Sequence, residues 1–471
     1  MIKTSRAIAG IIALSAAFSA FSCSSKSRSK TVSNTTEAVT DATVQRTTAS
    51  SVPTDTEITW LADYDIYPEG SSQPSPALTL FMNQFGGSVN YIHADHGKII
   101  QRFDEIRNSG GTVDMLPYDI SALPEGVSKG LYAPLDPYYS YMGMNEPGLW
   151  DGMNDLINRL AYKGQHYVIP YALSDPQILT YSRKLVQEAG LDDPYKLYTE
   201  GRWDWEAFMK TMEGFTEKAP AGIKRYGITG WFGQSAIQST GHSIVAYENG
   251  SFRNNIDDPA VGKAEQLMKD IADKGLYRSG WRDFYPTDQS TLFFASADYT
   301  LGVSNAKNEE LDLMAVPFPK YADAEKQYIS CNFDAKMLAV GSTKGAAVAA
   351  FIMCERYAAT DDKLALSAKE QALAVEKTGN GVNKSFITGE QYNAIQSYLD
   401  TSKVTPAFDP AYGMGSRMYS PGNYSYETRG VMDNLETVLL EEPGKADSWD
   451  SLRAAMTAIV ADEVDKLNKL N

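Results

Sequence analysis

Few residues of this chain have the types and spacing that enzymatic chemistry requires. The 471 residues include only four histidines, so acid-base catalysis by histidine has little material. The stretch from Gly241 to Val245 reads Gly-His-Ser-Ile-Val, one glycine short of the Gly-x-Ser-x-Gly turn that presents a nucleophilic serine in esterases. Because that sharp turn needs the small residue that Val245 replaces, we do not expect Ser243 to act as a nucleophile.

Metal and cofactor sites have equally little support. His93 and His96 are separated by two residues, which is a weak zinc signal outside a helix, and no Cys/His cluster has metal-site spacing. Walker A and Gly-x-Gly-x-x-Gly loops are absent, so ATP chemistry would belong to a partner. Cys331 and Cys354 are either a disulfide or two inert core thiols. We therefore expect no metal and no cofactor.

The charge of the chain is unevenly distributed. The formal net charge is −16, yet residues 1–30 hold five Lys and Arg residues and no acid, so the rest of the chain is still more acidic. A strongly acidic surface repels both nucleic acid and anionic lipid. We therefore expect no nucleic-acid partner and no electrostatic docking on a membrane.

Residues 1–23 have the pattern of an export signal. Lys3 and Arg6 precede an apolar run at 7–21 that is too short to span a bilayer comfortably. The Ala-Phe-Ser-Cys sequence that follows resembles the lipobox of bacterial lipoproteins, whose cysteine is acylated and becomes the mature N-terminus. The resemblance implies a lipidated Cys23 and an extracytoplasmic protein held on the cell membrane by its N-terminal lipid anchor only. The alternative is an ordinary cleaved signal with an incidental cysteine.

Residues 24–55 are expected to form a disordered tether. The stretch is rich in Ser and Thr and contains no aromatic residue, so it cannot bury enough apolar surface to fold. A flexible coil of this length reaches on the order of 30 Å, which would hold a folded domain clear of a membrane.

From residue 56 onward, short β-rich runs alternate with helical patterns, which is typical of layered α/β folds. Ser75 followed by Pro76 predicts the start of a helix, because a serine hydroxyl caps the first turn and proline fits its first position. The glycines at 86 and 87 predict its end. We expect strands at 58–64, 88–93, 113–118, 166–173, 178–181, 226–231, 313–318 and 336–340, and helices at 75–85, 98–108, 184–189, 205–216, 258–275, 345–357 and after Ser448.

The order of these segments resembles family 1 of the extracellular solute-binding proteins, the group that contains the maltose-binding protein and many oligosaccharide receptors of ABC importers. The resemblance covers residues 57–471 in layout. Two departures bear on the ligand: Ser182 stands where the family usually has Asn, and a glycine-rich turn is reduced to Gly302. The phrases that carry the resemblance are 110–115 (GGTVDM), 130–136 (GLYAPLD), 167–171 (YVIPY), 188–191 (EAGL), 203–205 (WDW) and 316–319 (VPFP).

The family's architecture implies an α/β fold of the periplasmic-binding-protein-like type II, with two α/β lobes joined by a three-crossover hinge. Two lobes also suit a chain longer than a single hydrophobic core usually supports. Several chain passes at one hinge let the lobes rotate while keeping them in register. We place the crossovers near 171–175, 299–303 and 329–333, which gives an N-lobe of 56–172 and 302–330 and a C-lobe of 173–301 and 331–471.

Residues that follow the predicted strands are the candidates for ligand contacts. In open α/β sheets, ligands bind beyond the carboxyl ends of the strands, where the strand order reverses. A sugar offers an apolar C–H face and a rim of hydroxyls, so Tyr or Trp beside Asp, Asn or Gln suits it. Any one of the 28 tyrosines can instead be a packing or surface residue. The candidates are Tyr64, Asp65, Tyr118, Asp119, Asp175, Trp231, Gln234, Tyr299, Asn332 and Tyr424.

Taken together, the residues and the resemblance predict a protein that holds a small ligand, a carbohydrate, between two lobes and performs no chemistry on it. The resemblance implies ABC permease subunits as partners, and we expect a monomer. Two alternatives stay open. A cell-surface glycoside hydrolase needs only two carboxylates about 5 to 10 Å apart, which 59 acidic residues make inevitable. A non-transport carbohydrate-binding surface protein would need an exposed binding face and no closure.

Overall fold

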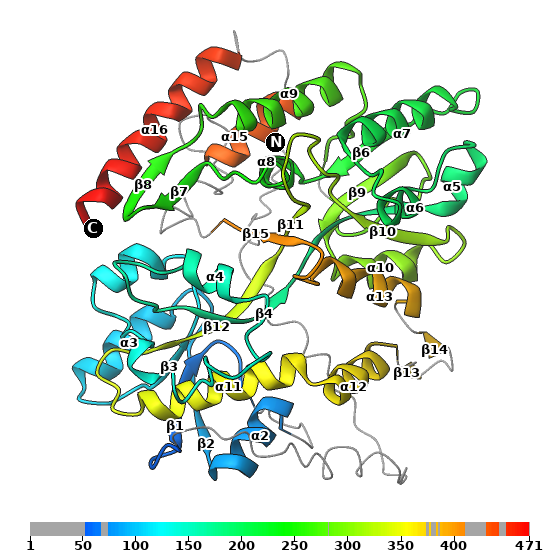
Figure 1. Cartoon of the computed structure of the whole chain (residues 1–471). Coiled ribbons are helices and arrows are strands. Elements are labelled where there is room, and N and C mark those ends of the chain that lie inside the picture. Colours follow the sequence, from blue (N-terminus) through cyan, green and yellow to red (C-terminus); the bar gives the residue numbers. More distant parts are fainter. Residues whose placement is uncertain are drawn as a thin grey trace, which may run out of the picture.

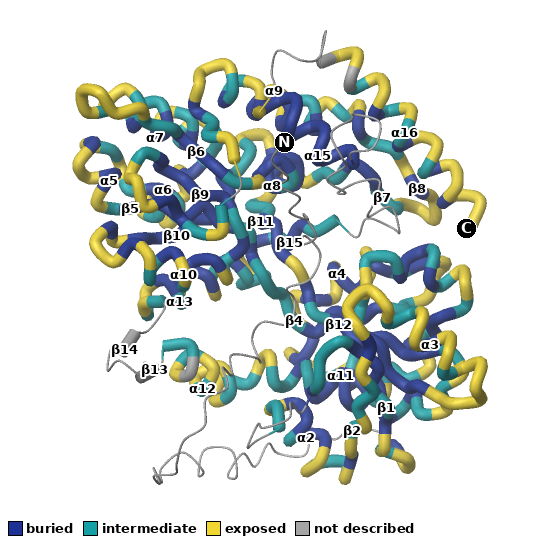
Figure 2. The backbone as a smooth tube through the Cα atoms, turned by 180° about the vertical axis from the view of Figure 1, so that it is seen from behind, coloured by how far each residue is buried: buried dark blue, intermediate teal, exposed yellow. Residues whose placement is uncertain are grey.

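The computed structural model describes residues 52–66, 74–280, 282–373, 376–377, 383–384, 387–409, 430–441 and 449–470. Within these residues the chain folds into two α/β lobes, one above the other in Figure 1. Most buried apolar residues form one connected cluster that runs through both lobes, and a small separate cluster consists of Tyr285, Phe294, Leu311 and Leu313. Figure 2 shows buried backbone inside each lobe. The predicted export signal, Cys23, all but the last four residues of the predicted tether, and Tyr424 lie outside the described residues.

The first lobe is built around a five-stranded sheet. Its elements are β1 (Glu57–Ala62), α2 (Pro76–Phe85), β2 (Ser88–His93), α3 (Ile99–Asn108), β3 (Met115–Pro117), the turns η1 (Ala122–Gly126) and η2 (Asp136–Tyr138), α4 (Asn154–Arg159), β4 (Ile169–Ser174), β12 (Asn332–Leu338), α11 (Gly345–Thr360) and α12 (Asp362–Leu373). The strand order is β2-β1-β3-β12-β4, and β12 alone runs antiparallel to its neighbours. α11 packs against α2, where Phe81 and Phe351 meet edge to face with ring centroids 5.3 Å apart.

The second lobe has a four-stranded sheet in the order β10-β5-β9-β6. Its elements are β5 (Gln177–Ser182), α5 (Arg183–Glu188), α6 (Pro194–Thr199), α7 (Trp205–Glu217), β6 (Tyr226–Gly230), α8 (Gly233–Gln238), β7 (Val245–Glu248), β8 (Ser251–Asn254), α9 (Pro259–Asp273), β9 (Thr291–Ala297), α10 (Thr300–Lys307), β10 (Leu313–Pro317), α13 (Gly389–Tyr398), α15 (Val431–Glu436), the turn η4 (Thr437–Glu441) and α16 (Trp449–Leu470). The rings of Trp203, Phe208 and Phe293 pack together in its core, with centroids 5.4 to 5.8 Å apart.

Local sequence signals set the helix ends as predicted. The Ser75 hydroxyl accepts a hydrogen bond from the Leu78 amide at the start of α2, and Gly86 ends the helix in the left-handed region at a φ of 62°. Asp258 caps α9 in the same way by accepting from the Ala260 amide. These predictions are confirmed because each depends on residues adjacent in the chain.

Three chain passes connect the lobes. The first runs from β4 to β5 through Asp175, and the second runs from β10 to β12 through β11 (Tyr328–Ser330). β11 pairs in parallel with β15 (Thr405–Ala407). The third pass runs from α12 to α13, and its described residues include β13 (Glu376–Lys377) and β14 (Asn383–Lys384). The crossovers predicted near 171–175 and 329–333 match the first two passes.

The crossover predicted near 299–303 is wrong. After β9 the chain continues through α10 into β10, and β10 pairs antiparallel with β5 from Leu313 opposite Ser182. Residues 302–318 therefore remain in the second lobe, while β12 and α11 complete the first. An apolar run such as β10 suits either buried sheet, so its local pattern does not say which sheet it joins.

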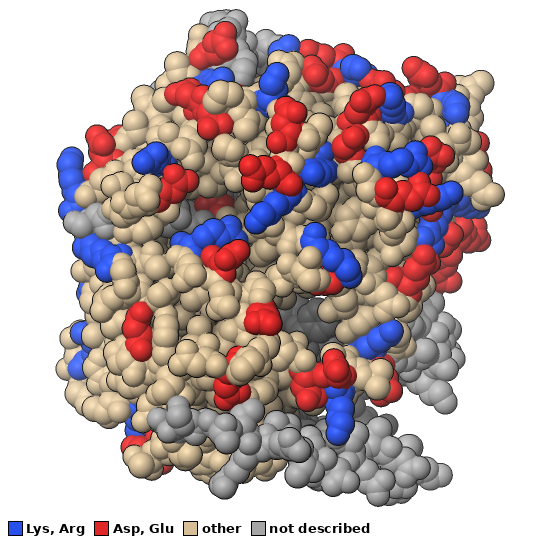
Figure 3. All heavy atoms as spheres, viewed as in Figure 1, with Lys and Arg blue, Asp and Glu red and all other residues tan. Residues whose placement is uncertain are grey.

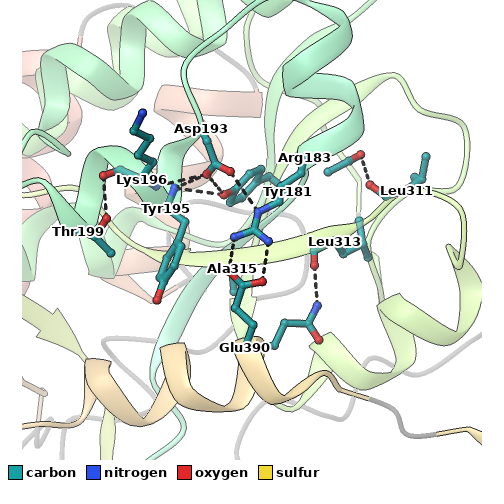
Figure 4. Close-up of polar contacts among 12 residues, drawn as sticks. Tyr181, Arg183, Asp193, Tyr195, Lys196, Thr199, Leu311, Leu313, Ala315 and Glu390 are labelled. Carbon is teal, nitrogen blue, oxygen red and sulfur yellow. Dashed lines mark hydrogen bonds and ion pairs between the residues drawn. The ribbon is translucent and has the colours of Figure 1, made fainter.

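The third pass is anchored to the second lobe by an arginine (Figure 4). The Arg183 guanidinium donates two hydrogen bonds of 2.7 Å to the Glu390 carboxylate on α13, and a third of 3.1 Å to Asp193. The neighbouring Gln391 donates to the Leu313 carbonyl at 2.6 Å. A bidentate pair of this kind fixes orientation as well as distance, so α13 is held on β10.

The lobes also touch away from the three passes. Tyr162, just after α4, is 2% exposed, and its ring lies 5.7 Å from that of Tyr247 and 6.4 Å from that of Phe252 on the β7–β8 hairpin. Lys163 donates to the Leu470 carbonyl at the end of α16 at 2.8 Å. The two lobes are therefore in contact across a second surface besides the crossovers.

We expect Arg183→Met to lower the free energy of unfolding by about 1 to 3 kcal/mol, because it leaves two carboxylates without their partner. Arg202→Met is the matched control. Arg202 pairs with Glu200 on the surface, and its loss should cost about 0.5 kcal/mol or less. Urea unfolding followed by tryptophan fluorescence measures both, and equal losses would contradict the anchoring role.

Candidate functional site

Polar side chains from both lobes meet where the first two passes run side by side. β4 and β12 are paired up to Ser174 and Asn332. The Asn332 amide donates to the Asp175 carboxylate at 3.3 Å, and the Ser174 hydroxyl donates to Asp334 at 3.1 Å. Asp175 has a φ of 45°, a left-handed conformation that aspartate tolerates better than most residues. The strand pairing thus joins side chains that lie far apart in the sequence.

The end of β9 brings two more side chains to this point. Ala297 pairs with Gln177, and the Asp298 amide donates to the Pro176 carbonyl at 3.2 Å. Asp298 therefore lies beside Asp175, and the side chain of Tyr299 next to it is 50% exposed. We call Asp175, Asp298, Asn332 and Asp334 the crossover cluster.

Sequence reasoning found Asp175, Tyr299 and Asn332 but missed Asp298. The missed residue precedes a tyrosine at a strand end, so it repeats the pairing of aromatic and acidic residues seen in Tyr118 and Asp119. That signal could have identified it.

Burial raises the pKa values of the acids in the crossover cluster. The pKa of Asp298 is raised to about 7 by burial and then by the charge of Asp175. The pKa of Asp334 is raised to about 6 by burial, although the charge of Lys336 and the hydrogen bond from Ser174 oppose the shift. Burial also raises the pKa of Asp175, against the hydrogen bond from Asn332. The cluster therefore holds acids whose ionisation changes near neutral pH.

Beneath the cluster, the first lobe contains a buried ion pair. Lys336 is 3% exposed and donates 2.6 Å hydrogen bonds to the Tyr171 hydroxyl and the Glu355 carboxylate. Burial raises the pKa of Tyr64 well above its usual value, and the charge of Glu355 adds to the shift. The Tyr64 ring also packs edge to face on Trp60 with centroids 5.5 Å apart. Tyr64 thus has a packing role in this lobe, while Asp65 is half-buried after β1.

The candidates after β3 also make local contacts. The ring of Tyr118 lies against Phe333 of β12 with centroids 4.8 Å apart, and its amide donates to the Ala335 carbonyl. The carboxylate of Asp119 is exposed and accepts from the amide of Ser121, which closes a turn. Tyr118 thus borders the second pass, and the exposed Asp119 closes the turn that follows it.

The second lobe presents an exposed tryptophan at the end of β6. Trp231 is 42% exposed, and the next residue, Phe232, is buried and stacks on Phe318 with centroids 6.0 Å apart. Trp231 borders a small hollow shared with Gln177 and Ser296, which lie two residues from Asp175 and Asp298 respectively. The exposed indole therefore lies beside the parts of β5 and β9 that lead to the crossover cluster. Figure 3 shows, on one face of the molecule, a hollow between the two lobes.

A buried glutamate that sequence reasoning missed lies behind Gln234. The Glu436 carboxylate on α15 accepts a hydrogen bond from the Gly233 amide at the start of α8, and it is 7% exposed. A side chain at position 233 would collide with Glu436, so glycine is needed for this close approach. Burial raises the pKa of Glu436 to about 8, and Asp433 and Glu441 add to the rise. About 200 residues separate the partners, so no local pattern could reveal the contact.

The residues considered for catalysis or metal binding are engaged elsewhere. The Ser243 hydroxyl donates to the Val245 carbonyl, and His96 bonds Asp63. Within the described ranges, no three His, Cys, Asp or Glu side chains are grouped as a metal ion would require. Cys331 and Cys354 are both buried free thiols, so the disulfide alternative is wrong. No helix in the described part of the chain has the length and apolar content to cross a membrane.

Comparisons with known proteins agree with this architecture. A family model described as bacterial extracellular solute-binding protein matches residues 77–369, more than half of the chain. No curated protein sequence matches the chain.

Many solved structures are similar in fold, and three of them serve as examples. The cyclic alpha-maltosyl-1,6-maltose binding protein of Arthrobacter globiformis is 13% identical, with 87% of this chain and 100% of that one covered and a TM-score of 0.59. The sugar-binding protein MalE of Xanthomonas citri is 15% identical over 87% and 98%, also with a TM-score of 0.59. UgpB of Mycobacterium tuberculosis, in complex with glycerophosphocholine, is 16% identical over 87% and 98%, with a TM-score of 0.54. These likenesses support a type II periplasmic-binding-protein fold.

The raised pKa of Asp298 predicts how the free energy of unfolding changes with pH. The folded chain holds this proton more tightly than the unfolded chain, so the stability it contributes is present at low pH and is lost as pH rises from about 4 through about 7. Asp298→Asn should therefore unfold with a free energy on the order of 1 to 3 kcal/mol higher than the parent at pH 8, and the difference should shrink toward pH 4.

Asp288→Asn is the control, because its free energy of unfolding at pH 8 should change in the opposite direction. Its hydrogen bonds with Arg278 hold the pKa of Asp288 well below the usual value, so this variant should be less stable than the parent at pH 8. Urea unfolding between pH 4 and 8 measures both variants. A difference between Asp298→Asn and the parent that does not change with pH would contradict the assignment.

Proposed function

The chain belongs to the bacterial extracellular solute-binding proteins, and on that premise we propose that it is the extracytoplasmic receptor of an ABC importer for a carbohydrate. The observation that carries the proposal is the meeting of Asp175 and Asn332, from two chain passes, with Tyr299 at the end of β9. The exposed Trp231 borders a hollow lined by residues of the same strands, β5 and β9. The carbohydrate class is supported by the two sugar-binding proteins among the similar structures.

The chemistry of these side chains suits a sugar. The indole of Trp231 and the phenol ring of Tyr299 are both exposed enough to stack on an apolar C–H face. The carboxylate and amide of Asp175 and Asn332 can each hydrogen-bond neighbouring hydroxyls. Neither the two aromatic rings nor the two polar side chains are sufficient alone, because a sugar has both an apolar face and a polar rim.

Closure of the lobes would bring the aromatic rings and the polar side chains into contact with the same ligand. The three passes allow a rotation that leaves each sheet intact, which is the usual basis of a hinge motion. A ligand that touches both lobes gains contacts only in the closed form, so it shifts the population toward closure. We propose that Tyr64, Asp65, Tyr118, Asp119 and Gln234 border the site, and that Tyr424 could join them from outside the described residues.

The same proposal includes where the receptor is located and how it delivers its ligand. The N-terminal signal and an acylated Cys23 would hold the receptor outside the cytoplasm, and ABC permease subunits would take the ligand from a monomeric receptor. Several acyl chains bind a membrane firmly, at about 0.8 kcal/mol per buried methylene.

One observation favours a second function, a glycoside hydrolase. Burial and the neighbouring Asp175 raise the pKa of Asp298 to about 7, and a pair of carboxyl groups that includes one with a raised pKa is what such an enzyme uses. Release of reducing sugar from oligosaccharides would support the hydrolase, and binding without turnover would support the receptor.

The receptor proposal predicts the behaviour of Trp231→Ala. In the parent, a saccharide at 100 times its dissociation constant should add about 2.7 kcal/mol of stability, seen as a rise in melting temperature. The variant should keep the unliganded melting temperature, because Trp231 is 42% exposed, yet lose about tenfold or more in affinity.

Met82→Ala is the matched control for this variant, since Met82 is 48% exposed on α2 in the first lobe. Its ligand-induced shift should equal that of the parent. A fall in the unliganded melting temperature of Trp231→Ala would instead identify Trp231 as a packing residue, and an unchanged ligand shift would remove it from the site.

A further inference from the structure

The charges around the crossover cluster bear on which carbohydrates can bind, if the proposed function holds. Asp175, Asp298 and Asp334 lie close enough for the charge of Asp175 to affect both of the others. Asp175 is fixed by the amide of Asn332 and Asp334 by the hydroxyl of Ser174, both neutral donors. The cluster thus has several carboxylates and neutral partners.

Lys336, a cation whose charge acts on Asp334, is already engaged. Lys336 lies 2.6 Å from the Glu355 carboxylate and 2.6 Å from the Tyr171 hydroxyl, and it is 3% exposed. Its ammonium also lies 4.6 Å from the centroid of the Tyr171 ring. A buried lysine held in this way cannot reach a ligand without breaking its ion pair, so it does not offer a charge to an anion.

A second position that could attract an anion is filled by the protein itself. The backbone amides at the start of a helix after a strand end commonly receive negative groups of ligands. Here the Glu436 carboxylate accepts from the Gly233 amide, two residues after Trp231. The glycine at 233 permits this approach. The carboxyl group of Glu436 therefore already takes the Gly233 amide, which is not available to a ligand anion.

We infer that the site selects by charge: it admits neutral or amine-bearing carbohydrates and rejects anionic ones such as uronates and sugar phosphates. The inference rests on the proposed function, because it concerns the same site, and it narrows the ligand class further. A ligand carboxylate or phosphate would lie among Asp175, Asp298 and Asp334, where Lys336, the described cation that acts on these acids, is already paired with Glu355. A ligand amine would reduce the repulsion among these acids.

A melting-temperature screen with saccharides of three charge classes tests the inference. The neutral set is malto-, cello- and galacto-oligosaccharides, the amine-bearing set is chitosan oligosaccharides, and the anionic set is oligogalacturonides and glucose 6-phosphate. At pH 8 and low salt, every saccharide that raises the melting temperature should be neutral or amine-bearing. An anionic saccharide that raises it as much as a neutral one of equal length would overturn the inference and leave the receptor proposal standing. If no saccharide of any class acts, the proposed function itself fails.

Variants connect the charge selection to the cluster. In Asp298→Asn, the ratio of dissociation constants for anionic and neutral saccharides of equal length should fall about tenfold. Asp104→Asn on α3 removes the same charge from an exposed position and should leave the ratio unchanged. Calorimetric competition against a neutral saccharide gives the ratio, and retained neutral binding shows that the variant is folded. An unchanged ratio in Asp298→Asn would contradict the assignment to this cluster.

Discussion

The antiparallel pairing of β4 with β12 is the constraint on which the rest of the structure depends. Through this pairing β12, which begins at Asn332, lies beside β4, which ends at Ser174, and the first sheet is complete. Because both strands continue into the second lobe, the chain passes must lie side by side. That juxtaposition brings Asp175, Asn332 and Asp334 together and places Asp298 and Tyr299 next to them.

Much of the local structure could be predicted because its causes are local. Ser75 and Gly86 determine the ends of α2, and Asp258 determines the start of α9, through hydrogen bonds within a few residues. The strand-end rule also selected Asp175, Tyr299 and Asn332, which the fold brings together, and Trp231, which adjoins them. The sequence therefore predicted the fold class and the positions of two of the three passes, and it selected residues that the fold brings together.

The remaining features depend on contacts between distant residues. An apolar strand such as β10 fits either sheet, so its place became clear only from its pairing with β5. No local sequence pattern indicates the hydrogen bond between the Gly233 amide and Glu436. The same holds for the ion pair between Arg183 and Glu390, which attaches the segment from α12 to α13 to the second lobe.

The central claim is that two incomplete sets of contacts become one site when the lobes rotate together. Small-angle X-ray scattering of the unliganded protein and of the protein saturated with its best saccharide tests this most directly. The account predicts a smaller radius of gyration with ligand, reversed when the ligand is removed. A scattering curve that does not change while calorimetry shows the site fully occupied would contradict the account.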